Sequence, residues 1–112
     1  MTVFGLVSWL GKKIRLTEIQ RTHIISRHRE IRGQMMKIKA TLKEPDSVWY
    51  SSKEENHHFY KWFEATPVSE KYLLVVVKFL NDEGFVVTAF FVSRMRRKDK
   101  VLVYGKEDTD SL

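Results

Sequence analysis

The chain has 112 residues, no cysteine and a net charge of +6, with 20 Lys and Arg against 14 Asp and Glu. This length fits one domain whose core needs no disulfide or metal, and the lack of cysteine excludes thiol catalysis and zinc–thiolate sites. The positive charge favours a polyanionic partner, nucleic acid before an anionic membrane.

The N-terminal segment is apolar over residues 3–10 and alternates over residues 14–16, after a break at Gly11. This pattern predicts two short strands joined at Gly11, or one bent strand. No apolar run approaches the ~20 residues that span a membrane, and residues 1–10 lack the basic start of a secretory signal. We therefore expect a soluble, unprocessed cytoplasmic protein that does not act at a membrane.

A capping-box pattern predicts the first helix, because Thr17 is followed three residues later by Gln20. The helix should begin at Thr17 and run to His28. Successive residues turn by about 100°, so His23 and Arg27 lie about 40° apart on one face, with Gln20 close to the same stripe. His28 can join that face only if the helix ends or bends at His28.

A second helix is predicted from apolar residues at helical spacing, namely Ile31, Met35, Ile38 and Leu42. Pro45 should end it. The apolar period then changes to two, which predicts four strands at residues 48–50, 57–63, 72–80 and 85–92, with a possible edge strand at 101–104. The segment 72–80 is almost continuously apolar and should be the central strand.

This order of elements predicts an α+β fold, with two N-terminal helices packed on a four- to five-stranded antiparallel sheet. Residues 1–105 should form a single domain, and residues 106–112 a polar C-terminal tail. In the last core strand, the alternation should place Val86, Thr88, Phe90 and Val92 on one face.

The chain resembles a group of small phage and bacterial proteins related to the barnase, EndoU, colicin D and RelE-like nucleases. The matching motifs are HIISRH in the first helix, TLKEPD at the end of the second, and VVVK and GFVVTA in the strands. The resemblance covers roughly residues 16–97. It implies a RelE/barnase-like fold and metal-independent cleavage of RNA, with no cofactor.

The resemblance implies catalytic roles for His23, Arg27, His28 and Thr88. The sequence departs from the group's pattern at Arg29, where the group usually has Pro. Metal-free RNA cleavage uses the ribose 2′-hydroxyl as nucleophile, and it needs a base, an acid and donors to the phosphate. We assign the base to His23, on the Arg27 face, and phosphate binding to Arg27. His28, near a helix C-terminus, is the candidate acid.

Three of the four catalytic candidates have a structural alternative. His23 could be half-buried against Ile19 and bonded to a strand carbonyl, and Arg27 could pair with a surface Glu. Thr88 could donate to a neighbouring carbonyl instead of a phosphate.

No metal site is expected. His57 and His58 are adjacent strand residues and point to opposite faces. His23 and His28 do not share a helix face either.

Further RNA-binding candidates are Gln20, Tyr60, Lys61, Arg94, Arg96 and Arg97. Tyr60 could stack a base beside Lys61, although an aromatic strand facing helices is usually core. The basic run over residues 93–100 could track an RNA backbone, with an affinity that falls as salt rises.

The first interpretation is a small toxin-like ribonuclease acting on single-stranded or loop RNA, such as mRNA or tRNA. Such a toxin needs an inhibitory partner, an acidic antitoxin or immunity protein. The alternative is a non-catalytic nucleic-acid or protein-binding module on the same fold. A third possibility is an interaction protein whose apolar residues 3–10 dock a partner chain or a second copy, giving a homodimer.

Overall fold

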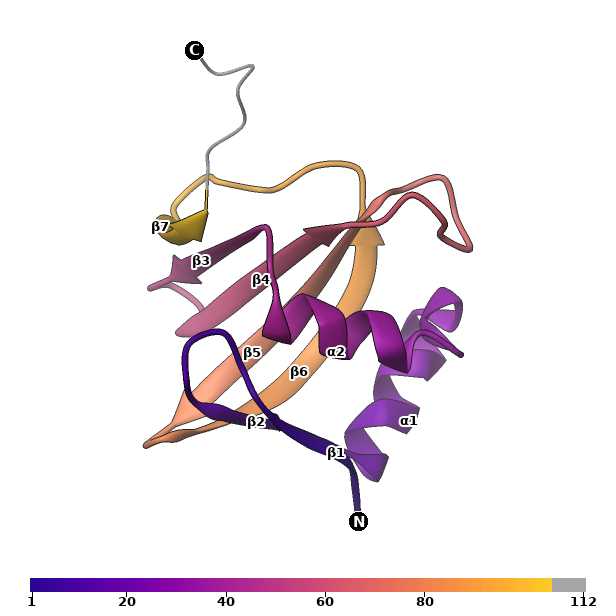
Figure 1. Ribbon diagram of the computed structural model, residues 1–112, viewed down its shortest axis with the longest axis horizontal. Helices are drawn as coiled ribbons and strands as arrows, with labels where there is room; N and C mark the ends of the chain where they lie inside the picture. Colours follow the sequence, from indigo (N-terminus) through magenta and orange to yellow (C-terminus); the bar gives the residue numbers. More distant parts are fainter. Residues whose placement is uncertain (106–112) are drawn as a thin grey trace.

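The computed structural model describes residues 1–105, and the predicted tail at 106–112 lies outside them. Within residues 1–105 the chain forms seven strands, two α-helices and one short 3-10 helix (Figure 1). In chain order these are β1 (Thr2–Val7), β2 (Lys13–Thr17), α1 (Glu18–Arg27), η1 (Arg29–Ile31), α2 (Met35–Lys43), β3 (Ser47–Ser51), β4 (Asn56–Trp62), β5 (Tyr72–Leu80), β6 (Glu83–Val92) and β7 (Val101–Gly105).

All seven strands belong to one mixed sheet in the order β1-β2-β6-β5-β4-β3-β7. The pairing is antiparallel except between β2 and β6, which run parallel. The predicted fold class is therefore wrong in three respects: the sheet has seven strands, it is not wholly antiparallel, and strands rather than helices begin the chain. The predicted central strand does lie in the interior of the sheet, as β5.

The N-terminal hairpin and the parallel pair explain this difference. Gly11 adopts a φ of +76°, which a glycine tolerates without strain, and the chain reverses there between β1 and β2. Of the two alternatives for this segment, the structure shows two strands joined by a turn. β2 then pairs with β6 through residues far away in the chain, which hydrophobic periodicity cannot reveal.

The helices cover one face of the sheet. Their buried residues Ile24, Ile31, Ile38 and Leu42 pack in one cluster with strand residues such as Val75. The first helix begins as predicted, with the Thr17 hydroxyl accepting a hydrogen bond from the Gln20 amide at 3.2 Å. The second helix begins later than predicted, because residues 29–31 form a separate 3-10 turn. No helix within residues 1–105 is long and apolar enough to cross a bilayer.

The opposite face, which we call the second face, has its own small core. Trp49, Tyr60, Leu74, Val76 and Val92 are buried there. Residues 93–100, which we call the basic segment, connect β6 to β7 along the upper ends of the strands in Figure 1, and Met95 packs against the second-face core. The contacts that hold it include a hydrogen bond from the Arg96 amide to the Tyr60 hydroxyl at 3.2 Å and a contact between the Ser47 hydroxyl and the Met95 sulfur.

A β-bulge interrupts β6. Val76 pairs with Thr88, but Val77 pairs with Val86, so Val87 is an extra residue. The prediction that Val86 and Thr88 share a face is therefore wrong. Because of the bulge, Val86 packs on the helix-bearing face, whereas Thr88 lies on the second face.

The edge of β6 beyond the bulge is packed by α1. Pairing of β2 with β6 ends at Arg15 and Phe85, shortly before β2 itself ends at Thr17 and α1 begins. The Gln20 side-chain amide donates to the Val87 carbonyl at this point. The bulge and this hydrogen bond together set α1 against the sheet edge, next to the second face.

Candidate active site

The first helix ends at its C-cap residue, His28. A helix end or bend at this residue is what the sequence required for the His28 imidazole to join the site predicted around His23 and Arg27. Its φ and ψ of −133° and 82° are not helical, although its amide still donates to the Ile24 carbonyl at 2.8 Å. The ring stacks on Phe90 of β6, with centroids 4.7 Å apart and planes at 20°. Phe90 packs with the second-face core, so the His28 imidazole lies at the border between α1 and that face.

A carboxylate lies on one side of this imidazole. Glu30 Oε1 is 3.6 Å from His28 Nδ1, and the two side chains are 25% and 31% exposed. This separation is an ion-pair contact rather than a hydrogen bond.

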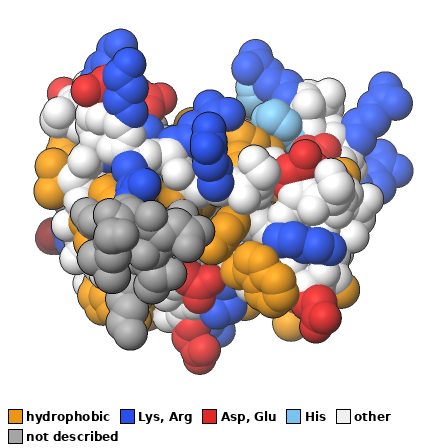
Figure 2. Space-filling model, turned by 90° about the horizontal axis from the view of Figure 1, so that it is seen from above, with side chains coloured by type: hydrophobic (Ala, Val, Ile, Leu, Met, Phe, Trp, Pro, Cys, Tyr) orange, Lys and Arg blue, Asp and Glu red, His pale blue; other side chains and the backbone are white. Residues whose placement is uncertain are grey.

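Phe90 also lines an open groove of about 1520 Å³. The groove is formed by the start of β5, the end of β6 and the basic segment, and its lining residues include Glu70, Tyr72, Phe90 and Arg94. Five of its lining side chains are cationic, against the acids Glu70 and Asp99. Figure 2 shows Lys and Arg side chains around a hollow in which hydrophobic side chains are visible. Phe90 therefore connects the His28 imidazole to a cationic groove.

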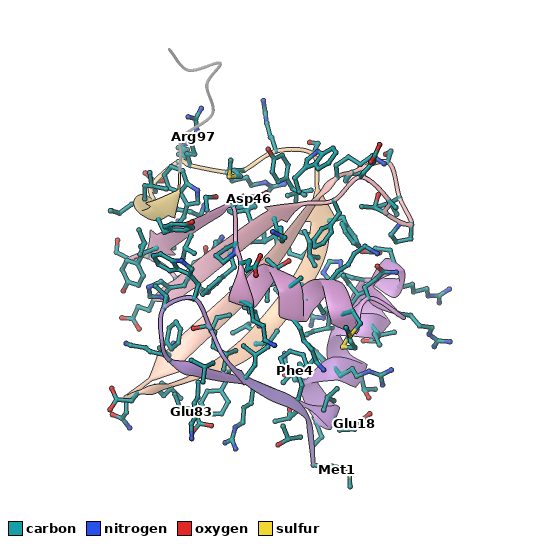
Figure 3. The ribbon with its side chains drawn as sticks, viewed as in Figure 1. Met1, Phe4, Glu18, Asp46, Glu83 and Arg97 are labelled. Carbon is teal, nitrogen blue, oxygen red and sulfur yellow. The ribbon has the colours of Figure 1, made fainter. Side chains whose placement is uncertain are left out.

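Three of the predicted RNA-binding arginines line this groove. Arg94, Arg96 and Arg97 are all exposed there, together with Lys98 and the partly buried Lys100. Figure 3 shows Arg97 at the end of the molecule opposite Glu18, the first residue of α1.

Thr88 lies on the same side of β6 as Phe90. It is partly buried, and it pairs with Val76, which pairs in turn with His58 on β4. Within residues 1–105 the Thr88 hydroxyl makes no hydrogen bond, so the alternative of a satisfied neighbouring carbonyl is not seen there.

His23 and Arg27 are exposed on α1. Neither side chain forms an ion pair or a side-chain hydrogen bond with another described residue, so the half-buried alternative for His23 is wrong. Helical spacing places both on the flank of α1 that carries Gln20 and away from Ile25, which packs with the helix-bearing core. No such contact joins either residue to His28 within the described chain.

Three predicted RNA-binding residues make contacts within the protein. The Gln20 side chain donates to the Val87 carbonyl of β6. Tyr60 is 0% exposed, so its ring cannot stack a base, and this corrects the prediction. Lys61 pairs with Leu73 on the helix-bearing face and donates to the Glu44 carbonyl at 2.7 Å, so it lies on the opposite face of the sheet from Tyr60.

His57 and His58 point to opposite faces, as predicted. His57 lies edge-on to Phe79, with ring centroids 5.1 Å apart. His58 is buried, with Nε2 2.9 Å from Asn56 Oδ1. Burial lowers the pKa of both imidazoles below 6.5, and Lys12 beside His57 lowers that pKa further. Among the described residues, no group of three His, Cys, Asp or Glu is placed to hold a metal ion.

Sequence reasoning missed Glu30 and the role of Phe90. The only signal for Glu30 was its position two residues after His28. On a regular helix, two residues at this spacing do not face each other. The end of α1 at His28 and the following 3-10 turn bring its carboxylate back to the ring. Nothing in the sequence indicated that Phe90 would meet His28.

Comparison with known proteins gives one family match. The model of a family described as phage-Barnase-EndoU-ColicinE5/D-RelE like nuclease2 matches residues 7–105. No curated protein and no solved structure matches the chain.

Proposed function

Because the chain belongs to this phage-Barnase-EndoU-ColicinE5/D-RelE like nuclease family, we propose that it is a metal-independent endoribonuclease that binds RNA in the groove beside His28. The observation that carries the proposal is the stack of His28 on Phe90. Phe90 also lines the cationic groove, so an imidazole capable of proton transfer adjoins a surface suited to phosphates.

The proposed reaction is a transesterification within the RNA strand. The ribose 2′-hydroxyl loses its proton to a base and attacks the adjacent phosphorus, and the bond to the 5′-oxygen breaks as that oxygen accepts a proton from an acid. The products are a 2′,3′-cyclic phosphate and a 5′-hydroxyl. Cations and hydroxyl donors stabilise the charge on the pentacoordinate phosphorus.

The roles follow the positions of the side chains. His28 supplies the proton to the leaving oxygen, because its ring stacks on Phe90, which lines the groove. His23 accepts the proton of the 2′-hydroxyl, and Arg27 binds the phosphate from the same flank of the helix. Thr88 donates to a phosphate oxygen from the strand beside them.

The groove favours a single-stranded or loop substrate such as mRNA or tRNA. Tyr72 and Phe90 offer aromatic surface on which bases stack, and the basic segment neutralises the backbone. We extend the proposal to a toxin-like role in the cytoplasm. An acidic antitoxin or immunity protein would then block the cationic groove.

The test is cleavage of bulk RNA by the purified protein in the presence of EDTA. We expect cleavage to persist and to leave 2′,3′-cyclic phosphate ends. His28→Ala should lower the rate by about 10²-fold or more, the usual contribution of a positioned acid or base. His57→Gln is the matched control, because His57 lies on the opposite face of the sheet and should leave the rate unchanged.

Loss of cleavage in EDTA, or a wild-type rate in His28→Ala, would overturn the proposal. RNA binding without cleavage by the wild-type protein would instead support a non-catalytic binding module on the same fold.

A further inference from the structure

We propose that Glu30 is a positioning residue for His28, holding a proton on Nδ1 so that Nε2 is the atom that exchanges a proton with RNA. The inference rests on the proposed function of His28. In this role the Glu30 carboxylate acts through the His28 imidazole and does not contact RNA.

The backbone fixes the two residues relative to each other. Glu30 lies in η1, directly after the end of α1, and the Ile31 amide donates to the His28 carbonyl at 3.0 Å. Ile31 is 0% exposed and packs in the core of the helix-bearing face. The carboxylate is therefore carried on a short turn that is anchored by a buried side chain, rather than on a free loop.

Two contacts orient the His28 ring. Phe90 holds its plane, with ring planes at 20°, and Glu30 lies on its Nδ1 edge at 3.6 Å. Nε2 is on the other edge of the ring, and within residues 1–105 no hydrogen bond to it is found. The partner of one imidazole nitrogen decides which nitrogen keeps the proton.

In the described part of the chain, the Glu30 carboxylate has no competing ion pair. Within the described residues, His28 is the only cationic partner within 4.0 Å of Glu30. The Glu30 side chain is also partly buried, so the negative charge is screened less than that of an exposed carboxylate.

The arrangement fits one proton step. The protonated imidazole gives its Nε2 proton to the departing 5′-oxygen as the bond from phosphorus to that oxygen breaks. The remaining proton stays on Nδ1, facing Glu30, and the ring becomes neutral without turning. His23 accepts the proton of the 2′-hydroxyl in the same reaction, so no further reactant is needed.

The first readout is the protonation pattern of the His28 ring, which long-range ¹H–¹⁵N NMR reports without any RNA. In the wild type, at a pH where the ring is neutral, we expect the proton on Nδ1. Glu30→Ala should move the proton toward Nε2, and Glu30→Gln should give an intermediate result, since an amide can still accept a hydrogen bond but carries no charge.

The second readout is the cleavage rate. Glu30→Ala should lower kcat by roughly 10- to 100-fold, as loss of a group that orients a histidine does elsewhere, with little change in KM for RNA. Glu18→Ala is the control, because Glu18 also forms an ion pair on α1, with Arg21 at 3.3 Å, but away from His28.

Two results would overturn the inference: a proton on Nε2 in the wild type, or a Glu30→Ala protein with an unchanged ring and an unchanged rate. An inactive wild type would defeat the proposed function alone, because the NMR readout decides the role of Glu30 without cleavage.

Discussion

His28 is fixed by its neighbours on three sides. It ends α1, its ring is stacked on Phe90, and Glu30 lies beside Nδ1. These contacts belong to the protein without RNA, so the imidazole is oriented before a substrate arrives. Such preorganisation is what a catalytic side chain requires. The exposed His23 and Arg27 lack these supports within residues 1–105.

The two strand histidines predict how stability depends on pH. Burial lowers the pKa of His57 and His58 below 6.5, with Lys12 and Lys100 lowering them further. Between the folded pKa and 6.5, the unfolded chain binds more protons, so stability rises with pH. The stabilisation should be complete above pH 6.5 and fall as the pH drops through the folded pKa values.

Urea unfolding at about pH 7.5 and about pH 5 measures this dependence. His58→Gln should make the difference between the two midpoints smaller, whatever it does to stability overall. A midpoint that is the same at both pH values would contradict the prediction.

At the scale of the elements, the bulge in β6 coincides with the contact of α1 on the strand edge. An unbroken strand would have kept Val86 and Thr88 on one face, and the extra residue, Val87, is the one whose carbonyl α1 contacts. The Gln20 side chain donates to the Val87 carbonyl, and His28, directly after α1, stacks on Phe90. Bulges often lie next to active sites for this reason.

An aromatic contact joins the N-terminal hairpin to the last strand of the described chain. Trp9, in the turn between β1 and β2, contacts Tyr104 of the edge strand β7, with ring centroids 3.8 Å apart and ring planes at 30°. The Trp9 amide also donates to the Leu42 carbonyl at the end of α2. The hairpin turn thus reaches across the helix-bearing side to support β7, next to the basic segment.

Trp9→Ala should therefore loosen β7. Loss of the aromatic pair should cost about 1 kcal/mol, and hydrogen exchange of the β7 amides should accelerate more than that of β5. Trp62→Ala is a matched control, because Trp62 is similarly exposed, at 49% against 43%, but stacks on no described ring. Equal acceleration in both variants would argue against a specific role for Trp9.

At the scale of the whole molecule, charge and shape act together. The net charge of +6 is not spread evenly, because five cationic side chains gather around the groove on the second face. An RNA strand in this groove would displace counterions from its backbone as it binds. Its affinity should therefore depend steeply on salt.

RNA binding to the His28→Ala protein, which keeps the strand intact, should weaken steadily from low to physiological salt. Replacing Arg94 or Arg97 by Ala should reduce the slope of log K against log salt by about 0.7 for each residue, the value for single strands. Lys43→Ala, on the helix-bearing side, should leave the slope unchanged. A flat binding curve in the wild type would rule out backbone binding by the basic segment.

The sequence alone determined what depends on neighbours within a turn or a strand. The Thr17 cap, the interior position of residues 72–80 and the opposite faces of His57 and His58 all follow from local periodicity and local hydrogen bonding. The motif pattern also identified the family.

Only the tertiary structure decided the seven-stranded mixed sheet, the burial of Tyr60, and the meeting of His28, Glu30 and Phe90. Each depends on segments distant in the chain or on a departure from regular geometry, namely parallel pairing, a bulge or a 3-10 turn. A periodic pattern carries no record of such contacts, because it states which face of an element is apolar and not what that face meets.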